Sequence, residues 1–271
     1  MEEGETQKTC NLLISKIFCA LYGWILTIQR KQKGGIVEKE QYVCTVCGFN
    51  MVGYHPDFCP FCGAPKEKFI TSEECSARFK VKGTPVNEKV TRLNSVPSLG
   101  LEHAAYRIET NGKTFWIDCP SCFDSSLKPA DIITFTHHHF LGASNQYRDY
   151  FHAKVRIHKL DSAHSICRAF TFDVTFQENF VERGIEAFHT GGHTPGFTFY
   201  LFEDVLLICD YVFLKEGGMS FNPFGPQKET RECAFKIDRV LQGRNISKVC
   251  GYNYVIDYKD WKKRFDALLI S

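Results

Sequence analysis

The sequence predicts a layered α/β sandwich preceded by a small metal-binding module. Three observations carry this prediction. After about residue 98, short apolar strand-like segments alternate with amphipathic helical segments. Before it, two Cys-x-x-Cys pairs, Cys44–Cys47 and Cys59–Cys62, are separated by eleven residues. A His-x-His pair, His137 and His139, directly follows a buried strand, where loop side chains two residues apart can converge on one metal ion.

Composition narrows the classes of function. A chain of 271 residues has room for one large domain and a small module. The formal net charge of +2, without a basic patch, gives no support for a nucleic-acid partner. The 13 cysteines are mostly scattered through apolar runs, a usage typical of a reducing compartment with one metal-bound cluster. We therefore expect an intracellular location, in the cytoplasm or in an organelle such as a plastid.

Residues 1–38 form an N-terminal extension that contains a nearly apolar stretch at residues 10–28. This stretch has about the length that crossing a bilayer requires, and Arg30, Lys31 and Lys33 follow it. A membrane anchor, a targeting segment that is later removed and a poorly ordered extension remain the alternatives. Early acidic residues argue against an ordinary signal or transit peptide.

The rest of the chain divides into three parts. Residues 39–70 hold the cysteine module, and residues 98–271 form the larger domain. The segment between them, residues 71–97, is polar and carries Gly83-Thr84-Pro85, which favours a linker with at most one strand.

The larger domain begins with a predicted β-hairpin. Apolar segments at residues 104–109 and 114–118 flank Asn111-Gly112, a strong signal for a tight turn between two strands. Further strands are expected at residues 131–136, 154–158, 184–188, 197–202, 205–209 and 248–250, and helices at residues 145–151, 230–242 and 258–269.

The four paired cysteines have spacing suited to a tetrahedral metal site, which zinc or a single iron ion would accept. Their neighbours, Tyr42-Val43-Cys44 and the run from Cys59-Pro60-Phe61-Cys62-Gly63 to Phe69, resemble the rubredoxin-like domain in the short form found in rubrerythrins. The resemblance implies one iron ion, held by Cys44, Cys47, Cys59 and Cys62, that exchanges electrons with a partner. A zinc ribbon that only stabilises the fold is the alternative.

Three further motifs join the His-x-His pair. His193 lies in Gly191-Gly192-His193-Thr194-Pro195-Gly196, Asp210 follows the strand ending at Cys209, and Asp118 ends an earlier strand. In this order the motifs resemble the metallo-β-lactamase fold superfamily over residues 98–271, which implies an αββα sandwich. His137 and His139 match its His-x-His pair, His193 its Gly-His-Thr-Pro-Gly histidine, and Asp210 its bridging aspartate.

The departures from the superfamily pattern fall on its second metal site. Leu141 and Gly142 stand where the Asp and His ligands of that site are expected, and Cys250-Gly251-Tyr252-Asn253 replaces a C-terminal Gly-His-Gly. The resemblance therefore implies a centre with one iron or zinc ion, whose ligands are His137, His139, His193 and Asp210. The alternative is a remnant that binds no metal.

Other polar residues are expected to support these ligands rather than to join them. His138 should face away from His137 and His139, because neighbouring side chains alternate on extended backbone. His158, Asp161, His164 and His189 are expected to be supporting or surface residues. Cys119-Pro-Ser-Cys122 is a weak candidate for a redox pair, because one such motif without a thioredoxin-like setting carries little information.

Three functions remain open. The first is a mononuclear redox enzyme, because the superfamily includes flavodiiron proteins and persulfide dioxygenases, and the dioxygenases retain a one-iron site of histidines and an aspartate. In it, His139 or His189 would orient a small substrate, which the sequence does not identify. The second is a hydrolase that attacks an ester, thioester or phosphodiester with a metal-bound water. The third is a non-catalytic scaffold in which only the cysteines hold metal.

Overall fold

The computed structural model describes residues 39–271, so the predicted membrane or targeting segment at residues 10–28 lies outside the described residues. Residues 40–271 form one unit, in which the cysteine module and the larger domain pack together. Between residues 39 and 271, no helix combines the length and the apolar character that crossing a membrane requires.

The cysteine module is a three-stranded antiparallel sheet. Its strands are β1 (Gln41–Cys44), β2 (Asn50–Val52) and β3 (Phe69–Thr71), with β1 in the centre, and a short 3-10 helix (Lys66–Lys68) precedes β3. Helix α2 (Ser72–Arg78) follows immediately. Thr71 and Glu74 form a capping box at its start, which satisfies two backbone N–H groups and so fixes where the helix begins.

A seven-stranded mixed sheet forms one half of the larger domain. Its strands are β4 (Lys80–Pro85), β5 (Val90–Val96), β6 (Ala105–Thr110), β7 (Lys113–Ile117), β8 (Ile132–Thr134), β9 (Lys154–His158) and β10 (Val174–Phe176). They lie in the order β10-β9-β8-β7-β6-β5-β4, and β7 to β10 run parallel to one another.

A six-stranded sheet forms the other half. Its strands are β11 (Phe180–Glu182), β12 (Ile185–His189), β13 (Thr198–Phe202), β14 (Val205–Cys209), β17 (Lys248–Gly251) and β18 (Val255–Asp257). A separate hairpin consists of β15 (Val212–Lys215) and β16 (Gly218–Phe221). The remaining helices are α3 (Ser144–Phe151), α4 (Lys159–Ser162), α5 (Gln227–Leu241) and α6 (Tyr258–Ile270), with 3-10 helices at His138–Phe140 and Ser165–Ala169.

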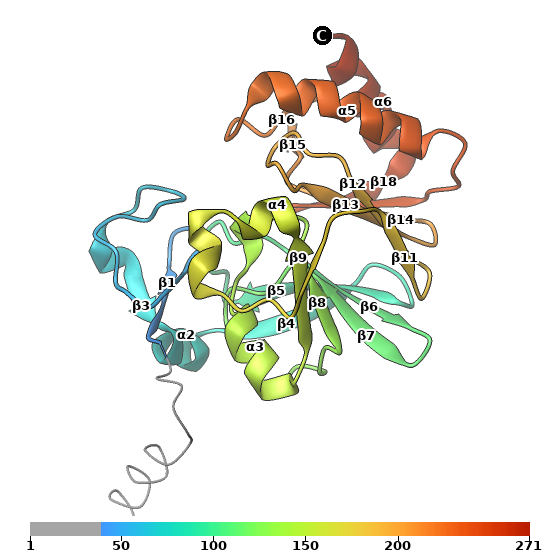
Figure 1. Cartoon of the computed structure of the whole chain (residues 1–271). Coiled ribbons are helices and arrows are strands. Elements are labelled where there is room, and N and C mark those ends of the chain that lie inside the picture. The colour runs from blue at the N-terminus through green and yellow to red at the C-terminus, as the bar shows by residue number, and fades with distance from the viewer. Residues whose placement is uncertain (1–38) are drawn as a thin grey trace, which may run out of the picture. The chain divides into compact units, whose positions relative to one another are not determined.

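The two sheets pack face to face, with helices on their outer sides (Figure 1). Tyr106 and Phe115 from one sheet meet Tyr200 and Phe202 from the other in a fully buried layer. Helices α5 and α6 cover the outer face of the six-stranded sheet, and α3 packs against the seven-stranded sheet. Each large side chain buried in this way stabilises the fold by about 1.5–3 kcal/mol. The predicted αββα sandwich is confirmed.

The segment expected to be a linker, residues 71–97, is instead α2 and the first two strands of the seven-stranded sheet. Strand β4 lies at the edge of this sheet, and most of its side chains are exposed. An edge strand with one solvated face has few apolar residues, which is why its sequence is as polar as that of a linker. The sheet of the larger domain therefore begins at Lys80 rather than near residue 98.

The predicted hairpin is confirmed. Asn111 and Gly112 connect β6 to β7, and both have positive φ, at 48° and 73°. A two-residue turn of this kind matches the twist of the flanking strands, and asparagine and glycine adopt it at low cost. The other strands and helices expected within residues 131–269 also form, with ends that differ by a few residues.

The strand ends converge at one edge of the sandwich. Asp118 directly follows β7, and His137 follows the neighbouring parallel strand β8, so both arrive at the same edge of the sheet. From the other sheet, Asp210 follows β14, and His193 lies in the connection between β12 and β13. A hydrogen bond from the backbone N–H of Thr198 to the carbonyl oxygen of Thr136 (2.9 Å) joins the two sheets beside them.

Candidate metal centres

The four paired cysteines lie around one point. The Sγ atoms of Cys44 and Cys62 are 3.8 Å apart, and those of Cys47 and Cys59 are 3.7 Å apart. A tetrahedron with zinc–sulfur bonds of about 2.3 Å has edges of about 3.8 Å, whereas disulfide-bonded sulfurs are about 2.05 Å apart. The geometry therefore fits one tetrahedral metal ion, and Cys62 is the only exposed member of this group.

A second group brings together His137, His139, His193 and Asp210, with one candidate ligand atom from each within 4.8 Å of the others. Nε2 of His137 is 3.1 Å from Nδ1 of His139 and 3.5 Å from Oδ1 of Asp210. The edges of a tetrahedron with zinc–nitrogen bonds of 2.0–2.1 Å are about 3.3 Å long. All four residues named from the sequence are therefore placed where one cation would hold them.

The electrostatics of this group also fit a cation. Burial lowers the pKa of His137 and of His139, and it lowers that of His193 to about 4, so the three imidazoles are neutral and able to bind metal. Burial and the nearby Asp118 raise the pKa of Asp210. Its Oδ1 atom is buried and has no hydrogen-bond partner among the described residues. A bound metal ion would supply the missing positive charge.

Asp118 and Thr136 fix the orientation of His137. Asp118 accepts hydrogen bonds from the backbone N–H (2.8 Å) and the hydroxyl (2.9 Å) of Thr136, and this hydroxyl is 3.0 Å from Nδ1 of His137. Because the hydroxyl has one hydrogen and directs it to Asp118, it accepts from Nδ1–H of His137. The Nε2 atom of His137 is then left free to face a metal.

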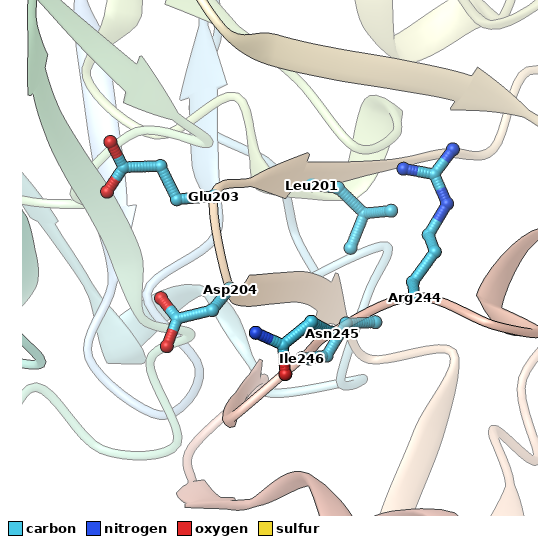
Figure 2. A pocket seen from close by; sticks show the side chains of 6 residues that line it. All are labelled: Leu201, Glu203, Asp204, Arg244, Asn245 and Ile246. Carbon is cyan, nitrogen blue, oxygen red and sulfur yellow. The ribbon is translucent and has the colours of Figure 1, made fainter.

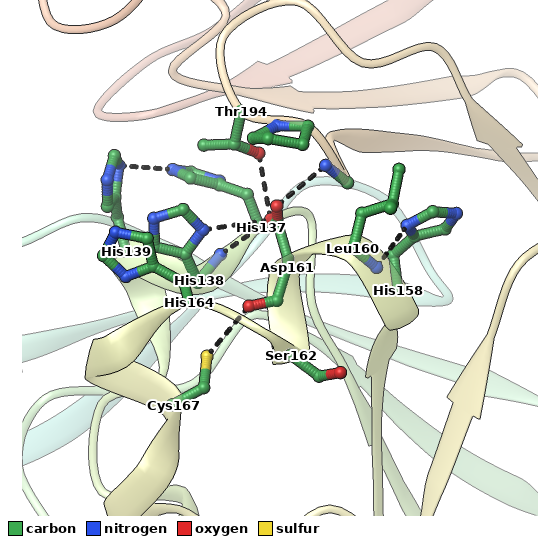
Figure 3. Close-up of polar contacts among 12 residues, drawn as sticks. His137, His138, His139, His158, Leu160, Asp161, Ser162, His164, Cys167 and Thr194 are labelled. Carbon is green, nitrogen blue, oxygen red and sulfur yellow. Dashed lines mark hydrogen bonds and ion pairs between the residues drawn. The ribbon is translucent and has the colours of Figure 1, made fainter.

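Asp161 connects the two ligand-bearing loops (Figure 3). Its side chain is completely buried. Oδ1 accepts a hydrogen bond from the backbone N–H of Gly196 (2.7 Å), and Oδ2 accepts from the hydroxyl of Thr194 (2.9 Å) and the backbone N–H of His138 (3.1 Å). Burial alone would raise the pKa of Asp161, but contacts with His138, Gly196 and Thr194 lower it overall. One carboxylate thus ties the His137–His139 segment to the His193 turn.

The other histidines pack around this arrangement without joining the ligand group. His138 faces Asp161, with Nδ1 3.3 Å from Oδ2, and the ring of His164 stacks on it with centroids 4.0 Å apart. His158 stacks on His189 at 3.8 Å, and Nε2 of His189 lies 2.9 Å from the carbonyl oxygen of Pro195. As expected, these residues lie in positions that support the ligand loops.

The positions expected for a second metal site hold no ligands. Leu141 is buried in the apolar core beside α3. Gly142 has a φ of +48°, and a Cβ atom there would overlap the carbonyl oxygens of Cys119 and Pro120. Near the C-terminal end, Tyr252 packs against Phe140 and Phe213. The local packing therefore excludes a larger side chain at Gly142.

This packing gives a test by mutation. Gly142→Ala is expected to lower the free energy of unfolding by about 3 kcal/mol, because backbone strain adds to overlap with fixed carbonyl oxygens. Gly217 is the matched control, since it has a φ of +69° and a Cβ atom added there would have no neighbour within 4 Å. Gly217→Ala should cost about 1 kcal/mol. Urea denaturation measures both, and equal losses would contradict the predicted overlap.

The Cys119–Cys122 motif is not arranged as an exposed redox pair. Both residues are fully buried, and burial raises the pKa of the Cys119 thiol. Sγ of Cys122 lies 3.4 Å from the carbonyl oxygen of Phe79. Redox-active cysteines are accessible and have lowered pKa values, so the redox interpretation of this motif is not supported.

Two residues at the histidine site were not singled out as site residues from the sequence. The amide of Asn222 contacts Asp210 and His193, and the ring of Phe61 contacts that of His139. Asn222 lies in a Pro- and Gly-containing loop without periodicity, and Phe61 lies within the cysteine motif. From the sequence, the loop at residues 221–226 could be expected to cover the site. Neither individual contact could be predicted, because each joins segments far apart in the chain.

A surface cavity of about 500 Å³ lies elsewhere, at the turn between β13 and β14 (Figure 2). Its lining residues are Leu201, Glu203, Asp204, Arg244, Asn245 and Ile246. Asp204 precedes β14, whereas Asp210 follows it, so the cavity and the histidine site lie at opposite ends of this strand. Its lining contains no histidine or cysteine, so it is separate from both metal centres.

A comparison with known protein families identifies the cysteine module. The family model described as "Rubrerythrin, rubredoxin-like domain" matches residues 42–70. The cysteine module is a rubredoxin-like domain. A comparison with curated protein sequences finds no match for the chain.

A comparison with solved structures identifies the fold of the larger domain. The metallo-β-lactamase from Pontibacter korlensis has a TM-score of 0.57 and 15% identity, covering 71% of this chain and 100% of its own. The larger domain has the metallo-β-lactamase fold. DIM-1 metallo-β-lactamase exposed to ceftazidime has a TM-score of 0.56 and 14% identity, covering 70% of this chain and 97% of its own.

A mutant flavo di-iron protein from Thermotoga maritima also matches, with a TM-score of 0.50 and 12% identity over 69% of this chain and 60% of its own. At such low identity these likenesses establish the fold and leave the reaction open. Together with the two ligand groups, they make the chain a metal-binding metallo-β-lactamase-fold protein with a rubredoxin-like module.

Proposed function

We propose that the protein is an iron-dependent redox enzyme, in which the rubredoxin-like domain supplies electrons to a one-metal centre held by His137, His139, His193 and Asp210. The observation that carries the proposal is a contact between the two sites. The rings of Phe61 and His139 meet edge to face, with centroids 5.5 Å apart and an interplanar angle of 61°.

Phe61 is part of the cysteine site, because it lies between Cys59 and Cys62 in the chain. His139 is the least buried of the four residues in the histidine group. A single side chain therefore connects the loop that would hold one metal with a ligand of the other. Iron at both sites would supply one-electron chemistry, with dioxygen as the oxidant and an external one-electron donor as the reductant.

Hydrogen bonds and apolar packing join the rubredoxin-like domain to the larger domain. The backbone N–H of Leu101 donates to the carbonyl oxygen of Val46 (2.8 Å), and Nδ2 of Asn50 donates to that of Ser121 (3.1 Å). Val43 belongs to the same apolar core as Leu93 of β5. The rubredoxin-like domain is thus built into the larger domain, as a fixed route for electrons requires.

The residues at the expected second metal position favour redox chemistry over hydrolysis. A second metal ion, which assists hydrolysis in two-metal enzymes, has no ligands at Leu141 and Gly142.

Reoxidation of the cysteine site tests the proposal. The full chain, loaded with iron, is reduced anaerobically and mixed with dioxygen while the visible iron–thiolate absorption is followed. In the wild type, reoxidation should be fast, because electrons leave through the histidine site. In the variant His137→Ala with His193→Ala it should be slow. Equal rates would show that the histidine site plays no part in this transfer, and a colourless, zinc-loaded preparation with esterase activity would favour the hydrolase.

Phe61→Leu tests the route itself. The substitution keeps an apolar side chain but removes the ring that touches His139, so reoxidation by dioxygen should slow while metal content stays the same. Phe58→Leu is the matched control, because Phe58 lies in the same domain and its side chain is 68% exposed. The route through Phe61 is wrong if both variants reoxidise at the wild-type rate.

A further inference from the structure

Asn222 lies beside Oδ2 of Asp210, whereas the other carboxylate oxygen, Oδ1, has no hydrogen-bond partner among the described residues. Its Nδ2 atom donates a hydrogen bond to Oδ2 of Asp210 (2.8 Å) and lies 3.3 Å from Nε2 of His193. The side chain of Asn222 is buried, with 2% of its surface exposed. An amide group is thus placed directly beside the histidine group without being one of its candidate ligands.

The orientation of this amide is determined by its surroundings. Oδ1 of Asn222 accepts a hydrogen bond from the backbone N–H of Phe224 (2.9 Å), so the NH₂ group must point toward Asp210. The backbone of Asn222 is held as well, by hydrogen bonds to Tyr211 (3.1 Å) and Gln227 (2.7 Å). The loop therefore presents a hydrogen-bond donor, and no acceptor, to the carboxylate.

The two oxygens of Asp210 consequently differ. Oδ1 is buried without a hydrogen-bond partner among residues 39–271 and faces Nε2 of His137 at 3.5 Å. Oδ2 already has a partner in Asn222. Oδ2 also lies 3.6 Å from Nε2 of His193. The NH₂ group beside Oδ2 carries partial positive charge but cannot bind a cation.

We propose that Asn222 holds Oδ2 of Asp210, so that this carboxylate binds the metal ion of the histidine group through Oδ1 alone. Asn222 is a positioning residue, because it acts through Asp210. The inference rests on metal binding by the histidine group, one part of the proposed function, and is independent of whether the reaction is redox chemistry or hydrolysis.

Cobalt(II) binding to the full chain tests this inference. The metal-free protein is titrated with Co²⁺, and the equivalents bound are counted while the d–d spectrum of the histidine site and the thiolate bands of the cysteine site are followed. The wild type should bind one ion at each site. Asn222→Asp has nearly the same shape but places an acceptor instead of a donor beside Oδ2, so the hydrogen bond is lost and the d–d spectrum of the histidine site should change.

Asn222→Ala provides a second readout. Without the amide, Oδ2 is free to join Oδ1 on the same ion, and the higher coordination number should weaken the d–d bands. Asn245→Asp, at an exposed position, is the control and should behave as the wild type. Unchanged thiolate bands show that a variant has folded.

The inference is overturned if both Asn222→Asp and Asn222→Ala leave the d–d spectrum of the histidine site unchanged. If the wild-type histidine site takes up no Co²⁺, the proposed metal centre fails together with it. Failure of the Phe61 experiment alone would reject the electron route and leave the role of Asn222 intact.

Discussion

Replacing His137 and His193 together with alanine is expected to remove one of two metal equivalents per chain, and to leave the iron–thiolate absorption of the cysteine site intact. The two ligand groups share no residue, and each fits one ion. Removing two of three imidazoles leaves His139 and Asp210, too few ligands to retain a metal ion against dialysis. Elemental analysis of purified protein measures the loss.

The reciprocal variant, Cys44→Ser with Cys47→Ser, should lose the other equivalent and the visible absorption. His164→Ala with His189→Ala is the control, because both residues lie near the site but outside its ligand group. If the wild type holds one equivalent only, and the cysteine variant removes it, the protein is a scaffold with a single metal site.

Asp161→Ala is expected to weaken metal binding at the histidine site by about 10–100-fold, although Asp161 is not a candidate ligand. The substitution removes the carboxylate that holds Gly196, Thr194 and His138 together. The His193 turn and the His137–His139 segment would then be free to separate. The loss of a buried, hydrogen-bonded charge should also lower the free energy of unfolding by about 3–5 kcal/mol.

Competition with a chelator for zinc measures this affinity, and urea denaturation measures the stability. Asp173→Ala is the matched control, because Asp173 accepts hydrogen bonds from Arg148 and the backbone of Val155 away from the metal site. It should reduce stability without weakening metal binding. An equal loss of affinity in both variants would show that Asp161 acts through general stability only.

The sequence predicted well those features that depend on local pattern. The spacing of the cysteines predicted the four-sulfur cluster, since a short turn brings the two cysteines of each Cys-x-x-Cys pair close together. The ligands at the histidine site follow strand ends or lie in a glycine-rich turn, and strands of one sandwich end at a common edge. Such features can be predicted because each motif consists of a few residues that are neighbours in the chain.

The features that the sequence did not predict depend on contacts between different segments of the chain. Strand β4 was expected to be linker because its exposed face is polar, and only pairing with β5 shows that it belongs to the sheet. The contact of Phe61 with His139 depends on how the rubredoxin-like domain docks, which hydrogen bonds from Leu101 and Asn50 determine.

By itself, the sequence indicated which side chains are candidates to bind metal, because His137, His139, His193, Asp210 and the four cysteines carry lone pairs and lie in recognisable motifs. The tertiary structure decided what surrounds them. It places Asn222 against Oδ2 of Asp210, Asp161 between the ligand loops and Phe61 against His139. These contacts join residues distant in the chain, and their geometry is set by the packing of two sheets and a docked domain, which no local pattern encodes.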